Sequence, residues 1–365
     1  VNGPFTFGPD GSPLIGPVPG LQNYWVAVGV MAGFCPGGGV GKCIAEWIID
    51  GEPSIDVWAM DVARFGEYAS PQYGTIKSSE NYERRFIMTF PNETLPKGRK
   101  QKTTSLYDRF VRNGAVMGDT FGLENVLWFA NNIDDAHEVP TFKRSRSHEY
   151  VTKEVKNVRE NVGIIELANF SKHQFIGNEA RNFLNKILSG FIPNLGRISL
   201  NPMNTPKGKL YGDLTVGCLG DDNFYIFGSG AAQEMHRRWF ERYIKEYKVD
   251  YINKSDDLHG FAITGPKSRI VMQKLVKENI SNDNFRFRDI RKMFVGGVPA
   301  IVNRLSFTGE LGYEIYVSPH YHLKLYEEIM NAGENENIKN FGSRALMSMR
   351  MEKNWGAWAL DFRHD

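Results

Sequence analysis

The sequence predicts a multidomain protein of mixed α+β and α/β class. Its 365 residues, of which 41% are hydrophobic, are enough to bury more than one core. An apolar run at residues 24–30 leads through a glycine-rich turn into a helical pattern, which is typical of an α/β unit. From residue 114 onward, helical patterns alternate with short strand patterns that favour antiparallel hairpins.

The N-terminal part contains one clear strand and one clear helix. Residues 1–20 are rich in Gly and Pro, so we expect loops and turns there. Residues 24–30, YWVAVGV, suit a buried strand, and Asp50 and Gly51 end the helix that follows. The apolar face of that helix is expected to consist of Val40, Ile44, Trp47 and Ile48.

The rest of the chain divides into a connector and a larger body. Residues 55–112 are aromatic and mixed in charge, and their basic loop 96–110 looks like a link between two bodies, with a boundary near Asn113. Helices are expected within 154–163, 178–190, 231–247, 266–276 and at the start of 343–365. Strands are expected within 173–177, 213–228 (a hairpin that turns at GDDN), 260–265, 297–307 and 312–319.

The charge and cysteine content narrow the classes of partner. With 44 basic and 42 acidic residues, the net charge of +2 creates no field that would gather nucleic acid or an anionic membrane, and we expect neither partner. The longest apolar run, 24–34, is shorter than the roughly 20 residues of a membrane span. Three cysteines without a C-x-x-C pair favour a reducing compartment. His320 and His322 have no acid or thiol at ligand spacing, so no metal is expected.

The glycine-rich turn fits neither common phosphate-binding motif. A P-loop that ended at Lys42 would need Gly where Pro36 stands and Ser or Thr where Cys43 stands. A dinucleotide fingerprint from Gly37 would place its third glycine on Lys42. Two readings remain: a helix N-terminus that approaches a flat or anionic group closely, or a turn that only packs a helix on a sheet.

The residues around this turn carry a family resemblance. Segments 8–34 and 37–65 resemble the end of the FAD-dependent amine oxidoreductase domain of the dimethylglycine and sarcosine dehydrogenases. The resemblance implies that the helix N-terminus faces the pyrimidine edge of the flavin ring, where negative charge collects after hydride transfer. The FAD-binding residues that it implies are Gly33, Phe34, Gly37, Gly38, Gly39 and Val40.

The same resemblance continues along the chain. Residues 79–109 resemble the middle domain of that family, and residues 114–355 resemble its folate-binding part, which is shared with the glycine cleavage T-protein, an aminomethyltransferase. It implies domains at 1–56, 57–113 and 114–365. The FAD phosphate unit, the flavin-attachment histidine and the amine site are expected before Val1, and a final small barrel after Asp365.

Two acids are the main folate-side candidates. Asp213 could be a strand-start aspartate on the surface; the resemblance instead makes it the base near N5 or N10 of tetrahydrofolate, where such a group contributes about 10²-fold. Alternation places Glu314 and Tyr316 on one face of a strand and Tyr313, Ile315 and Val317 on the other. Glu314 could be a half-exposed strand glutamate, or could accept hydrogen bonds from the pterin.

Three further residues complete the implied folate site. Tyr211 lies beside Asp213 in sequence, and Phe307 stands where relatives often have Tyr. Arg350 borders an apolar helix face and needs an anion, either a protein carboxylate such as Glu352 or Asp361 or the glutamate tail of folate.

The resemblance implies a part of an FAD-dependent dehydrogenase that oxidises an N-methyl amine and passes the one-carbon unit to tetrahydrofolate as 5,10-methylene-tetrahydrofolate. Its electron acceptor would be a flavoprotein or O₂, and its location a bacterial cytoplasm or the mitochondrial matrix. This piece alone is expected to be inactive in oxidation. A free-standing folate-dependent aminomethyltransferase or demethylase would leave residues 1–113 without a role, and a non-catalytic regulatory relative remains an alternative.

Overall fold

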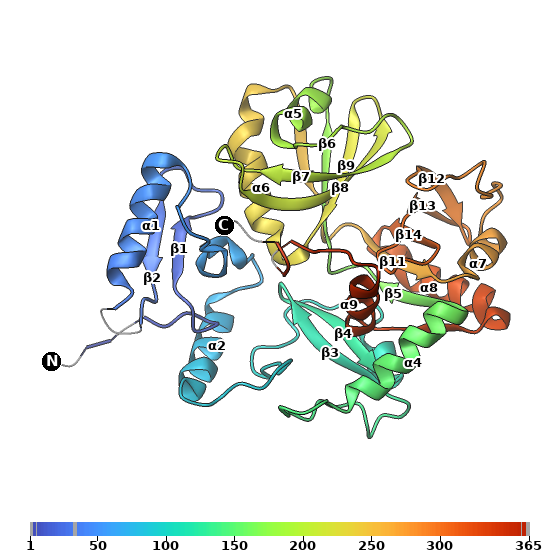
Figure 1. Ribbon diagram of the computed structural model, residues 1–365, viewed down its shortest axis with the longest axis horizontal. Helices are drawn as coiled ribbons and strands as arrows, with labels where there is room; N and C mark the ends of the chain where they lie inside the picture. Colours follow the sequence, from blue (N-terminus) through green and yellow to red (C-terminus); the bar gives the residue numbers. More distant parts are fainter. Residues whose placement is uncertain (1–2, 5, 32–34, 359, 363–365) are drawn as a thin grey trace.

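The computed structural model describes residues 3–4, 6–31, 35–358 and 360–362. Figure 1 shows a small N-terminal body, coloured blue, beside two bodies that are each built on a β-sheet. The mixed class predicted from the sequence is confirmed, and so is the prevalence of antiparallel pairing. Within the described residues, the single parallel strand pair of the two large sheets joins β15 to β5.

The N-terminal body is a two-stranded ribbon covered by one helix. β1 (Leu14–Pro17) pairs antiparallel with β2 (Trp25–Val28), and α1 (Gly37–Asp50) packs on them through a buried cluster with Ile15 and Val40 at its centre. The expectation of loops alone in residues 1–20 was wrong. Backbone pairing with the strand that follows holds β1 extended although Gly and Pro surround it.

A run of short helices links this body to the first hairpin of the larger part. The helix α2 starts after Ser70, whose hydroxyl accepts from the Tyr73 N–H. The elements are η1 (Trp58–Met60), η2 (Val62–Arg64), α2 (Pro71–Arg84), α3 (Tyr107–Arg112), β3 (Ala115–Thr120) and β4 (Leu123–Phe129).

The first large sheet has five strands in the order β10-β6-β9-β8-β7. Two helices cover one of its faces, and Phe175, Leu214 and Phe240 lie fully buried between them and the strands. The strands are β6 (Ser171–Ile176), β7 (Ile198–Asn204), β8 (Leu210–Gly220), β9 (Asn223–Gly228) and β10 (Asp250–Asn253). The helices are α5 (Ala180–Ile187) and α6 (Gln233–Tyr243), with the short turns η3 (Gly230–Ala232) and η4 (Ile244–Glu246) at the ends of α6.

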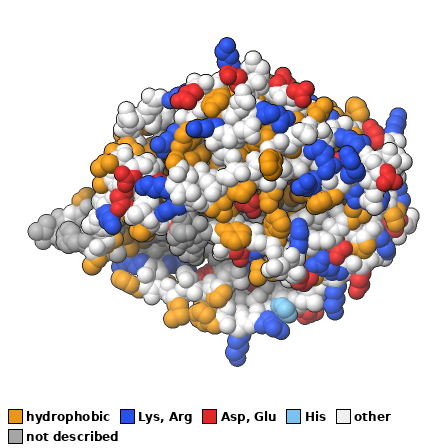
Figure 2. Space-filling model, turned by 45° about the horizontal axis from the view of Figure 1, so that its top comes forward, with side chains coloured by type: hydrophobic (Ala, Val, Ile, Leu, Met, Phe, Trp, Pro, Cys, Tyr) orange, Lys and Arg blue, Asp and Glu red, His pale blue; other side chains and the backbone are white. Residues whose placement is uncertain are grey.

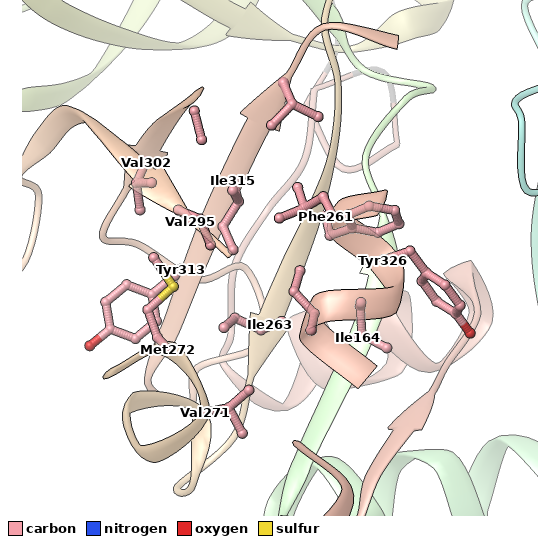
Figure 3. Close-up of a cluster of buried hydrophobic side chains, with 14 of the residues drawn as sticks. Ile164, Phe261, Ile263, Val271, Met272, Val295, Val302, Tyr313, Ile315 and Tyr326 are labelled. Atoms are coloured by element: carbon pink, nitrogen blue, oxygen red, sulfur yellow. The ribbon is translucent and has the colours of Figure 1, made fainter. Parts of the chain in front are cut away.

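The second large sheet has six strands in the order β12-β13-β14-β11-β5-β15. They are β5 (Val162–Glu166), β11 (His259–Thr264), β12 (Ile290–Val295), β13 (Val298–Asn303), β14 (Gly312–Val317) and β15 (Ile338–Asn340). On one face, shown in Figure 3, Phe261, Ile263 and Ile315 meet Met272 and Tyr326 of two helices. Those helices are α7 (Ser268–Leu275) and α8 (Pro319–Gly333), followed by η5 (Glu334–Glu336); α4 (Ser147–Glu160) and α9 (Ser343–Glu352) pack on the opposite face.

The two large sheets meet through a separate buried cluster. On the first sheet it contains Tyr225 and Phe227 of β9, and on the second Ile301 and Tyr316. The rings of Phe227 and Tyr316 stack, with 4.5 Å between their centroids and 22° between their planes. Offset stacking adds roughly 0.5–1.5 kcal/mol to the burial of the rings. The face of β8 and β9 that points away from α5 and α6 is therefore held against β14.

A buried ion pair fastens the N-terminal body to α6. Arg238 is bound to the carboxylate of Asp61, and its Nη1 also donates to the Pro17 carbonyl at 2.8 Å. The Asp61 side chain is 1% exposed, and it also accepts from the Ala63 N–H. Removing one partner of such a pair strands the other charge in a dry environment.

We predict that Asp61→Ala lowers the free energy of unfolding by about 3–5 kcal/mol, because Arg238 loses its counter-ion. Urea unfolding measures the change. The matched control is Asp257→Ala, since Asp257 pairs with Lys254 at the surface and is 63% exposed; it should cost less than about 1 kcal/mol. Equal costs for the two variants would show that the link between the bodies does not depend on this ion pair.

Candidate functional site

Asp213 lies on β8 without a partner among the described residues. It is opposite Pro202 of β7 and half-buried, and its carboxylate makes no hydrogen bond or ion pair in the part of the chain that the structure describes. Burial raises the pKa of Asp213 to about 6, because little water remains to solvate the charge. Near neutral pH it is therefore ionised but poised to take up a proton, as a general base must be.

Glu314 lies on β14 of the other sheet. The hydroxyl of Tyr316 donates to its Oε2 at 2.9 Å. Burial raises the pKa of Glu314 to about 7, while hydrogen bonding from Tyr316 acts in the opposite direction. The predicted alternation is confirmed, because Tyr313, Ile315 and Val317 lie in the core beneath α7 and α8. Glu314 and Tyr316 face the other way.

The packing of the two sheets turns both acids toward the same inter-sheet region. Asp213 is two residues before Thr215, so the two share a face of β8, and Thr215 pairs with Phe227. Phe227 stacks on Tyr316, which binds Glu314. A base on one sheet and a hydrogen-bond acceptor on the other suit a ligand that carries several N–H donors.

Two predicted folate residues pack against other parts of the chain. Tyr211 is packed on Trp239 in the core under α6, and its hydroxyl accepts from Arg238 at 3.3 Å. Phe307 packs against the cluster between α4 and α9. The structure therefore places Tyr211 on the opposite face of β8 from Asp213, and a folate contact of Phe307 stays a prediction.

Arg350 has a carboxylate partner inside the chain. Its Nη1 is bound to Asp361 and donates to the Trp355 carbonyl at 2.8 Å, and the residue is 6% exposed. Of the two alternatives left open by the sequence, the structure thus shows the protein carboxylate. A contact of Arg350 with a folate tail stays a prediction.

The glycine-opened helix that the sequence predicts is α1. Gly37, Gly38 and Gly39 form the exposed first turn of α1, and a side chain added at any of them would have no atom of the described chain within 4 Å. Val40 is buried beneath them. Gly33 and Phe34 lie outside the described residues. The open first turn, with no side-chain cap at Pro36, leaves backbone N–H groups that fit an electron-rich ring edge.

A second group of buried titratable residues was not predicted from the sequence. Lys172 is 0% exposed, and its Nζ donates to the Ala168 carbonyl at 2.9 Å. Burial lowers its pKa to about 7 and raises that of Glu166 to about 7. Burial also lowers the pKa of His322 to about 3. These residues come from β5, β6 and α8, so no spacing along the chain could have revealed the group.

The surface and the side-chain clusters limit other kinds of site. Figure 2 shows basic and acidic side chains interspersed on the face it presents. Within 3–4, 6–31, 35–358 and 360–362, no three His, Cys, Asp or Glu side chains are grouped as metal ligands would be. None of the helices in these same ranges is long and apolar enough to cross a membrane. Cys35, Cys43 and Cys218 are all free thiols.

Two large sheets that meet face to face, with helices packed on them, and a small helix-covered ribbon define a multidomain α+β protein. The model of the GCVT N-terminal domain matches residues 106–365, so the chain belongs to that family. The model of the FAD dependent oxidoreductase central domain matches residues 50–104. The resemblance stated from the sequence is confirmed.

Individual relatives agree with both matches. The chain is 36% identical to mitochondrial dimethylglycine dehydrogenase of Homo sapiens over 369 residues, which is 100% of this chain and 42% of that protein. It is 27% identical to human mitochondrial sarcosine dehydrogenase, across 100% of this chain and 44% of that protein. The crystal structure of the glycine cleavage system aminomethyltransferase T from Bartonella henselae shares its fold, with a TM-score of 0.60 and 18% identity over 72% of this chain and 65% of that one. The chain spans less than half the length of the two dehydrogenases.

The raised pKa of Asp213 predicts how the stability of the chain depends on pH. In the unfolded chain an aspartate titrates near about 3.9. The contribution of Asp213 to the free energy of unfolding is therefore fully present below the pKa of the unfolded chain, and it is lost as the pH rises through about 6. We predict that Asp213→Asn is more stable than the natural chain by about 1 kcal/mol at pH 8, after allowance for partial exposure, and equal to it at about pH 4.

Thermal unfolding across this pH range measures the effect. The control is Asp221→Asn, an exposed acid in the turn of the same hairpin. A loss of stability in Asp213→Asn at every pH would mean that the carboxylate has a structural partner.

Proposed function

We propose that this chain is part of an FAD-dependent N-methyl amine dehydrogenase of the dimethylglycine or sarcosine type. In the whole protein, an N-methyl group is oxidised and its carbon passes to tetrahydrofolate as 5,10-methylene-tetrahydrofolate. Matches to an FAD oxidoreductase central domain and to the GCVT family, in this order in one chain, support the pairing of these two activities. The proposed domains are 1–56 for the end of the oxidoreductase domain, 57–113 for its middle domain and 114–365 for the folate part.

The observation that carries the folate half is the half-buried carboxylate of Asp213, which has no partner among the described residues and lies on the face of β8 that meets the second sheet. When the two nitrogens of tetrahydrofolate bond to the one-carbon unit, each loses a proton. Asp213, whose pKa of about 6 lies near neutral, is suited to accept one of them. Its negative charge also stabilises the cationic state that precedes ring closure.

In this proposal, Glu314 and Tyr316 orient the pterin. A pterin presents an amino group and a ring N–H on one edge, and a carboxylate accepts both hydrogen bonds. The Tyr316 hydroxyl already holds one oxygen of Glu314 in place, which reduces the conformational freedom lost on binding. Asp213 then faces the reactive nitrogens from the opposite sheet.

The first turn of α1 serves the oxidative half. FAD accepts the hydride from the amine when it is bound. Gly37, Gly38 and Gly39 let the helix N-terminus approach the ring edge closely, and its dipole favours the negative charge that collects there. Electrons would leave to a flavoprotein or O₂, and the mitochondrial relatives support a matrix location over a bacterial cytoplasm.

We predict that the purified chain binds tetrahydrofolate and accelerates its condensation with formaldehyde, which forms 5,10-methylene-tetrahydrofolate and water. Asp213→Asn should reduce the acceleration about 100-fold, because the proton acceptor is lost, and should change the dissociation constant little. The acceleration should fall as the pH drops through about 6, since protonated Asp213 cannot act as a base. Absorbance of the product gives the rate, and calorimetry gives the affinity.

Two controls make this experiment decisive. Asp221→Asn should match the natural chain, and Glu314→Gln should weaken binding about tenfold because one charge-assisted acceptor is lost. A chain that does not bind tetrahydrofolate, or an Asp213→Asn variant with undiminished acceleration, would contradict the proposal.

A further inference from the structure

A cavity of about 700 Å³ lies between the N-terminal body and α6. Cavities of roughly 300–1,000 Å³ commonly hold small molecules. Neither Asp213 nor Glu314 lines it, so it is distinct from the inter-sheet site. Its walls are rich in large aromatic rings, namely Trp25, Trp47, Trp58, Tyr211 and Trp239.

Two polar groups in the wall have no partner within the described ranges. Glu52 is 7% exposed, and neither oxygen of its carboxylate accepts a hydrogen bond. The indole N–H of Trp239 is also buried and donates to nothing. A buried polar group without a hydrogen bond costs free energy. The cost is largest for the carboxylate, because it is charged. A ligand that supplied a cationic donor to Glu52 and an acceptor to Trp239 would remove both costs.

The cationic side chain of Arg242 lies next to the chain segment that contains Glu52. Arg242 lines the cavity, and its Nη1 lies 3.4 Å from the carbonyl oxygen of Gly51, the residue before Glu52. Among the described residues Arg242 makes no ion pair, whereas the neighbouring Arg238 is bound to Asp61. Lys209, another lining cation, donates to the Ser54 carbonyl at 2.8 Å. One buried carboxylate and one exposed guanidinium without a carboxylate partner among the described residues thus line the same cavity.

We propose that this cavity binds a free α-amino acid with an aromatic side chain. Its ammonium group donates to Glu52, and its carboxylate accepts from Arg242 and from the Trp239 N–H. A single carbon separates the two charges of an α-amino acid, which matches the adjacency of Glu52 and Arg242. The ring of the ligand packs among the indoles, where aromatic pairs are favourable. The proposal does not depend on the proposed folate and flavin chemistry, since Asp213, Glu314 and the first turn of α1 do not line this cavity.

Titration of the chain with L-phenylalanine tests the proposal, with tryptophan fluorescence and calorimetry as readouts. We expect saturable binding that Glu52→Gln weakens at least about tenfold, because the ammonium loses its counter-charge. Glu149→Gln, at a surface site on α4 where the side chain is 72% exposed, should bind as the natural chain does. Phenethylamine and 3-phenylpropionate, which each lack one charge, should both bind more weakly.

Two further measurements separate ligand binding from a structural role. Without ligand, Glu52→Gln should melt at the same or a higher temperature, because no group in the described part of the chain bonds to its carboxylate. Arg242→Gln, whose side chain is solvent-exposed, should weaken binding of L-phenylalanine but not of phenethylamine. Absence of saturable L-phenylalanine binding, or equal affinity in Glu52→Gln, would overturn the proposal.

Discussion

The proposed folate chemistry depends on the desolvation of one carboxylate. Asp213 is half-buried on a strand that faces a second sheet, and no group of the described chain offers it a hydrogen bond or a counter-ion. Burial of a charge without compensation costs free energy, and the raised pKa of Asp213 expresses that cost. Such a cost is common where a group acts on a bound molecule, since a partner within the protein would hold the carboxylate ionised and make it a weaker base.

The rest of the structure keeps Asp213 in this setting. The five-stranded sheet is anchored from behind by α5 and α6, and its front meets the six-stranded sheet through the stacked rings of Phe227 and Tyr316. Tyr316 also holds Glu314, so one side chain both packs the sheets together and orients the second acid. At the other end, Asp61 and Arg238 fasten the N-terminal body to α6.

The sequence predicted those features that depend on local periodicity. Alternation assigned Glu314 and Tyr316 to one face and Tyr313 and Ile315 to the other, and the GDDN turn located the β8–β9 hairpin. It could not place Tyr211. Tyr211 is two residues from Asp213, so regular alternation would put both side chains on the same face of β8. An irregularity in the pairing of β7 with β8, between Met203 and Asn204, instead turns Tyr211 into the core under α6. The tie between Asp61 and Arg238 and the cavity beside Glu52 join segments nearly 180 residues apart, which no pattern along the chain reveals.

The most direct test is the titration of the Asp213 carboxyl carbon by ¹³C NMR in aspartate-labelled protein, assigned by the signal lost in Asp213→Asn. The account predicts a pKa of about 6 in the free chain and a change in that pKa when tetrahydrofolate is added. A pKa at or below about 4, the ordinary value for aspartate, that did not respond to tetrahydrofolate would contradict the claim that Asp213 is a desolvated base facing a ligand.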